Sequence, residues 1–89
     1  MVTIQEATRS AIVFAQEALG ERARGLQLEE IESDKEDGVD VWRITLSMIV
    51  ADPMNALAAL RSRRDYKAFT VIKDTGEVTS MKIRELSKL

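Results

Sequence analysis

Residues 66–83 read YKAFTVIKDTGEVTSMKI, and they predict two strands joined by a tight turn. Aromatic and β-branched residues fill the first part, and apolar residues resume after the turn, as is typical of a β-hairpin. Asp74 can accept hydrogen bonds from the following backbone, and Gly76 can adopt positive φ without a steric penalty. Apolar residues fall on both faces of the first strand. Either a bulge therefore lies near Tyr66 and Lys67, or both faces are partly covered.

The first twenty residues predict an amphipathic helix. Thr3 and Glu6 have the spacing of a capping box, and Gly20 is suited to end the helix. The apolar stripe contains Ile4, Ala7, Ala11, Phe14, Ala15 and Ala18, and Ile12 and Leu19 widen it. Its alanine-rich middle favours close approach to a sheet, and Val13 is the one apolar residue on the opposite side.

Two further strands are expected between this helix and the hairpin. The first contains Leu26, Leu28 and Ile31, whose spacing implies a bulge or a fraying end, and a charged turn at 33–38 follows it. In the second strand, Trp42, Ile44, Leu46 and Met48 alternate with Arg43, Thr45 and Ser47. This alternation predicts one buried and one solvated face, with Trp42 anchoring the core.

A short helical insert is expected between the second and third strands. Asp52 and Pro53 form a typical helix start, and good helix formers occupy 54–60. Consecutive strands joined by short connections pair antiparallel. The sequence therefore predicts one α+β domain over residues 1–89, in which an N-terminal helix packs on a four-stranded antiparallel meander.

Composition narrows the classes of function. The chain has 89 residues and contains neither cysteine nor histidine, so the commonest nucleophile, general base and zinc ligands are missing. Small secreted domains usually need disulfides, and Glu6, Arg9 and Glu17 interrupt any apolar signal segment, so we expect a cytoplasmic protein. The net charge is −5 over residues 1–45 and +3 over 46–89, a split that folding either preserves or mixes.

No motif in the chain predicts catalysis or a cofactor. The acidic group 34–40 fails the spacing of an EF-hand, because Gly38 and Thr45 fall where a ligand and the final Glu are required. The glycines are scattered singly, which excludes a phosphate-binding loop. A pI near 5.1 and few aromatics disfavour nucleic-acid binding. We assign no catalytic, cofactor-binding or metal-binding residue, and no membrane span.

The insert and the residues after it are the predicted partner-binding surface. If 54–60 is helical, three apolar residues lie toward one side and three arginines follow as a polar rim. The six candidates are Met54, Leu57, Leu60, Arg61, Arg63 and Arg64. A cover over the end of the sheet is the alternative role. A meander also leaves two edge strands, either of which can pair with a second copy across a two-fold axis.

The helix, the Trp42 strand and the closing segments 66–71 and 74–78 resemble the PepSY-like branch of the cystatin-like α+β folds. The resemblance implies a helix that precedes a meander, and a regulatory or inhibitory role toward peptidases. PepSY-type domains are typically exported or membrane-attached, and the insert departs from their pattern, so no site residue is carried over. The element order is also similar to that of gas-vesicle accessory protein O.

We therefore expect a small, non-enzymatic cytoplasmic protein that acts through protein–protein contacts, as a homodimer. One alternative is a PepSY-like or cystatin-like regulator of a peptidase, as the resemblance implies. A further alternative is a small-ligand-binding module that uses the concave face of the sheet.

Overall fold

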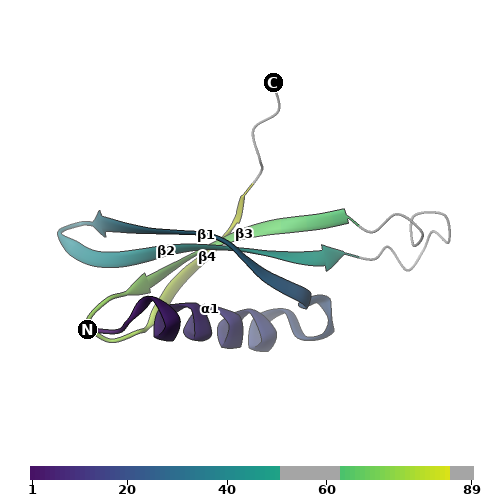
Figure 1. Cartoon of the computed structure of the whole chain (residues 1–89), viewed down its shortest axis with the longest axis horizontal. Helices are drawn as coiled ribbons and strands as arrows, with labels where there is room; N and C mark the ends of the chain where they lie inside the picture. Colours follow the sequence, from purple (N-terminus) through teal and green to yellow (C-terminus); the bar gives the residue numbers. More distant parts are fainter. Residues whose placement is uncertain (51–62, 85–89) are drawn as a thin grey trace, which may run out of the picture.

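The computed structural model describes residues 1–50 and 63–84 of the chain. Its elements, in order, are the helix α1 (Ile4–Leu19), a 3₁₀ turn η1 (Gly20–Arg22), and the strands β1 (Arg24–Glu36), β2 (Val39–Val50), β3 (Arg63–Ile72) and β4 (Val78–Arg84). The strands form one antiparallel sheet in the order β1-β2-β3-β4, and α1 lies against one face of it (Figure 1). The predicted α+β meander is confirmed. The expected insert over 54–60 lies outside the described residues.

The helix begins and ends where its sequence signals place the boundaries. The Thr3 side chain accepts a hydrogen bond from the Glu6 N–H at 3.1 Å, and Glu6 Oε1 accepts one from the Thr3 N–H at 2.9 Å. This confirms the capping box. Gly20 has a φ of 57°, and the chain leaves the helix there.

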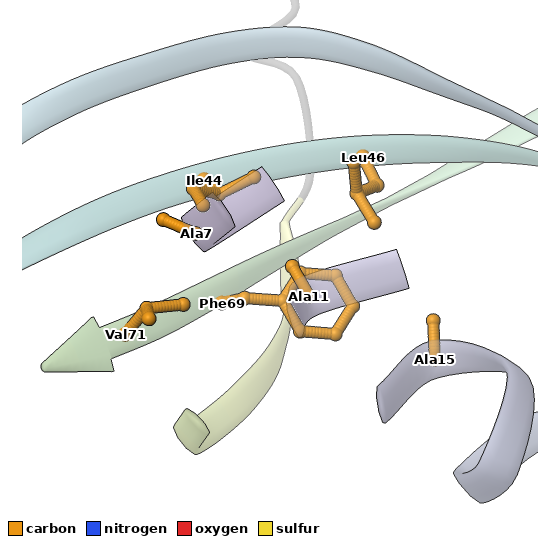
Figure 2. Close-up of a cluster of buried hydrophobic side chains, with 7 residues drawn as sticks. All are labelled: Ala7, Ala11, Ala15, Ile44, Leu46, Phe69 and Val71. Atoms are coloured by element: carbon orange, nitrogen blue, oxygen red, sulfur yellow. The ribbon is translucent and has the colours of Figure 1, made fainter. Parts of the chain in front are cut away.

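Three alanines of α1 form the helical side of the core. Ala7, Ala11 and Ala15 are fully buried, whereas the predicted ends of the stripe, Ile4 and Ala18, are exposed. The alanines face the side chains of the two inner strands, which are Ile44 and Leu46 of β2 and Phe69 and Val71 of β3 (Figure 2). Alanine has no atoms beyond Cβ, so the helix approaches the sheet closely and packs directly on its larger side chains.

Aromatic residues join the ends of the helix to the sheet. The rings of Phe14 and Phe69 meet edge to face, with centroids 6.3 Å apart. Trp42 is half-buried at the margin of the core. Its Nε1–H donates to the Val2 carbonyl at 3.4 Å, and Lys73 Nζ lies 4.2 Å from the ring centroid. The single tryptophan therefore ties the N-terminal segment to β2.

The first hairpin turn is tighter than predicted. β1 continues to Glu36, so the turn consists of Asp37 and Gly38 instead of the whole segment 33–38. Both residues have positive φ, of 51° and 82°, which is the geometry that a two-residue hairpin needs. The charged residues that suggested a loop belong to the strand. The predicted bulge in β1 is confirmed by the register shift between Leu28 and Glu30.

The face of the sheet opposite α1 is the open face, and its residues are more buried than predicted. Thr45, Ser47 and Thr70 are at most 5 % exposed, although we expected Thr45 and Ser47 to be solvated. No described element covers them, and arginine side chains of the strands bind them instead. The β2–β3 register is continuous through Tyr66 and Lys67, so partial cover of both faces, and not a bulge, explains the pattern of β3.

Candidate functional site

The predicted partner-binding residues are only partly visible in the structure. Met54, Leu57, Leu60 and Arg61 lie outside the described residues. Arg63 is the first residue of β3, and its side chain is also outside the description. Arg64 is the second residue of β3 and is half-buried.

The Arg64 side chain extends across the open face and forms hydrogen bonds with residues of β1 and β2. Its Nε donates to Ser47 Oγ at 2.8 Å, and its Nη2 donates to the Ser47 carbonyl at 3.3 Å and to the Gly25 carbonyl. Ser47 Oγ in turn donates to the Glu29 carboxylate. The guanidinium therefore holds the start of β1 against β2, and its role in partner binding stays a prediction.

A second arginine organises the far end of the open face. Arg43 donates to Asp34 Oδ2 at 2.6 Å, to Glu36 Oε2 at 3.1 Å and to Thr70 Oγ1 at 3.1 Å. The hydrogen bond from Arg43 lowers the pKa of Asp34, and a second bond from the Lys35 N–H acts in the same direction. The same contact with Asp34 raises the pKa of Arg43. The acidic residues that we assigned to a turn are thus ligands of a guanidinium.

A third arginine spans the width of the sheet. Arg84, at the end of β4, donates to Thr45 Oγ1 at 2.6 Å and pairs with Glu30 of β1. The Glu30 contact raises the pKa of Arg84. Among residues 1–50 and 63–84, every buried side-chain nitrogen and oxygen has a hydrogen-bond partner. The open face is thus closed by its own side chains.

The outer edge of β4 has no partner strand among the described residues. Within the described residues, β4 pairs with β3 alone, so half of its backbone N–H and C=O groups point outward. On the helix side of this strand, Val78 and Met81 are half-buried, and Ile83 is 75 % exposed. We call the apolar residues Val13, Val78, Met81 and Ile83 the β4 strip.

A groove borders the turn end of β4. It lies between α1 and the β3–β4 turn and has a volume of about 610 Å³. Val13, Phe14 and Val78 contribute apolar lining, and Glu17 and Glu77 contribute carboxylates. Glu6 also lines it, but the Thr3 backbone hydrogen bond holds that carboxylate in the capping box and lowers its pKa. Arg9 also lines the groove, which therefore offers an apolar surface with both acidic and basic neighbours.

A hydroxyl of β4 is bound within the sheet. The Ser80 hydroxyl donates a hydrogen bond to Thr70 Oγ1 at 3.0 Å, so this hydroxyl is bound to the neighbouring strand of the sheet. In the part of the chain that the structure describes, no three acidic side chains gather closely enough to bind a metal ion. What the arrangement can do is present an unpaired strand beside apolar side chains.

Sequence reasoning missed two parts of this arrangement. The arginine contacts have a signal in the sequence, because Glu30, Glu32, Asp34 and Glu36 alternate as strand residues do. The β4 strip has a weaker signal in the sequence, because Val13 is the only apolar residue on the polar side of the predicted helix.

Comparison with known proteins assigns no relative, since the chain matches no family model, no curated protein and no solved structure. Across residues 1–50 and 63–84, no helix has both the length and the apolar character that crossing a membrane requires.

Proposed function

We propose that this is a small, non-enzymatic cytoplasmic protein that acts through protein–protein contacts as a homodimer. The observation that supports the proposal most is the unpaired β4 edge with the β4 strip beside it. An exposed edge flanked by apolar side chains is a template for another strand, and proteins that do not use such an edge usually protect it with charges. The lack of cysteine supports the cytoplasmic location.

The homodimer is tested by sedimentation equilibrium of the full chain over a range of micromolar concentrations. The expected result is a mass that rises from one chain toward two as the concentration increases. A mass of one chain at every concentration contradicts the homodimer. Recovery of a tagged copy from its native cytoplasm then identifies any further protein that binds the dimer.

The second candidate function is regulation of a peptidase. It follows from the resemblance to PepSY-like domains, and the observed order of a helix followed by four antiparallel strands is the order which that resemblance implies. In this case, the purified protein slows or activates peptidases encoded near it. No change in their rates at a molar excess of the protein counts against this function.

A further inference from the structure

We infer that β4 is the edge through which the homodimer forms, with β4 of one copy pairing antiparallel to β4 of the second. The two sheets then join into one continuous sheet, and α1 of both copies lies on the same side of it. This inference rests on the proposed homodimer, and it names the surface and the partner, a second copy of this chain.

The opposite edge is unsuited to the same contact. β1 carries five carboxylates against two basic side chains, so a second β1 placed beside it would bring like charges together. Register shifts between Arg24 and Gln27 and between Leu28 and Glu30 also distort its edge. Charges and bulges are the features by which natural proteins prevent pairing of an exposed strand. β4 carries no acidic residue and only two basic ones, and its one register shift against β3 lies at its first residues, opposite Thr70 and Val71.

The register of the pair follows from the charges on β4. A two-fold axis perpendicular to the sheet keeps each face on its own side, so helix-side residues meet helix-side residues. Centring the pair on Met81 sets Lys82 opposite Ser80 of the other copy. Centring it on Lys82 would place two ammonium groups opposite each other, and centring it on Ile83 would place Lys82 opposite Arg84. Centring on Met81 therefore avoids like charges, and it is also the register that pairs the whole of Val78–Arg84.

This register also makes the apolar features of β4 complementary to each other. Ile83 is the most exposed residue of the β4 strip and lies at one end of the strand, whereas the groove lies at the other end. Antiparallel pairing about Met81 brings Ile83 of each copy toward Val78 and Val13 beside the groove of the other. Lys82 of each copy also moves toward the end of the strand where Glu77 is exposed. Each contact occurs twice across the axis.

The experiment compares Ile83→Asp with Leu28→Asp, a matched change at the edge that β1 provides. Leu28 is 45 % exposed and lies on the other edge strand, so both variants add one carboxylate at an exposed apolar position. We expect Ile83→Asp to raise the dimer dissociation constant by about tenfold or more, and Leu28→Asp to leave it within about twofold. Circular dichroism of each variant establishes that it is folded.

A cross-link gives a second test, which does not depend on the stability of the aspartate variants. The chain has no cysteine, so Met81→Cys introduces a single thiol. Residues opposite each other in antiparallel strands have Cα atoms about 4.5–5.5 Å apart, within the range that a disulfide spans. Oxidation of Met81→Cys is expected to give a covalent dimer, whereas Glu32→Cys on β1 gives none.

The outcomes separate the inference from the proposal on which it rests. A wild-type dimer that Ile83→Asp dissociates, together with the Met81→Cys cross-link, supports the β4 interface. A dimer that persists in folded Ile83→Asp and that Met81→Cys does not cross-link overturns the β4 interface and leaves the homodimer intact. A wild-type chain that is monomeric throughout overturns both.

Discussion

The two edge strands of the sheet differ in charge, in length and in how other residues use them. β1 has thirteen residues and a net charge of −3, and its carboxylates accept hydrogen bonds from arginines of β2 and β4. β4 has seven residues and a net charge of +2, and apolar side chains lie along its helix side. The two edge strands therefore carry opposite net charges, and Arg84 of β4 pairs with Glu30 of β1 across the open face.

The difference shows that charges on an edge strand have two effects in this fold. The carboxylates of β1 oppose pairing with a second β1, and they also attract the arginines that cover the open face. β4 has no carboxylate, and its exposed residues are Thr79, Lys82 and Ile83. Its Arg84 contributes to the cover of the open face by binding Glu30 and Thr45. One edge is thus used within the chain, and the other is the edge through which we propose that a second chain pairs.

The largest loss of stability is expected from Phe69→Ala, which removes a large side chain from the core beneath the whole sheet. Phe69 is 1 % exposed and packs between the alanines of α1 and the inner strands. Loss of its ring leaves a cavity, so the free energy of unfolding should fall by roughly 3–5 kcal/mol. Urea denaturation measures this change, and Tyr66→Ala, at a half-buried position on the open face of the same strand, is the control. A smaller loss in Phe69→Ala than in the control would place the core elsewhere.

Arg64→Ala is expected to loosen the β1 edge selectively. The substitution leaves the Gly25 carbonyl and the Ser47 hydroxyl without their donor, at a cost of roughly 1–3 kcal/mol. Amide exchange by NMR should show faster exchange at the start of β1 and little change in β4. Arg22→Ala, at an exposed position in η1, serves as the control. Equal effects of the two substitutions would contradict the role given to Arg64.

Gly76→Ala and Gly38→Ala compare the two hairpin turns that lead to the edges. Both glycines have φ near +80°, so each substitution carries a backbone cost of about 1–2 kcal/mol. A Cβ at Gly76 would also lie 3.1 Å from Val2 Cγ1, whereas one at Gly38 meets nothing within 4 Å. Thermal unfolding should therefore show the larger loss for Gly76→Ala. The reverse order would mean that the N-terminal segment does not contact this turn.

Acid is expected to weaken the β1 edge before the rest of the sheet. The pKa of Asp34 lies below its ordinary value of 3.8 in the folded chain, so its contribution is complete above that value. It is lost as the pH falls through the lowered pKa. Unfolding experiments should thus show no Asp34-dependent change between about pH 7 and pH 5, and a decline below about pH 4. Asp34→Asn should reduce this acid-dependent decline, and an unchanged profile in that variant would exclude the Arg43 contact as its cause.

The elements that could be predicted from the sequence are those with local signals. The capping box at Thr3 and Glu6, the alternation of Ile44 and Leu46, and the turn at Gly76 each depend on residues a few positions apart. Such patterns follow directly from the helical and strand periods. The meander followed from them, because short connections favour antiparallel neighbours.

The contacts that could not be predicted join residues distant in sequence. Ser47 is buried because Arg64 and Glu29 converge on it, and neither neighbour is known until the strand register is fixed. The exposed edge of β4 could not be predicted for a similar reason, since only the strand order shows that Ile83 lies on an outer strand. The sequence alone therefore points to 54–64, where apolar and basic residues are adjacent.

The most direct test of the β4 interface is amide hydrogen exchange, measured by NMR on both edge strands at a concentration where the chain is dimeric. Our account predicts that the N–H groups of β4 that point away from β3 are protected, and that their protection decreases on dilution. The outward N–H groups of β1 should exchange rapidly at every concentration. Rapid exchange along the outer side of β4 in the dimer, or protection that appears on β1 instead, would contradict the account.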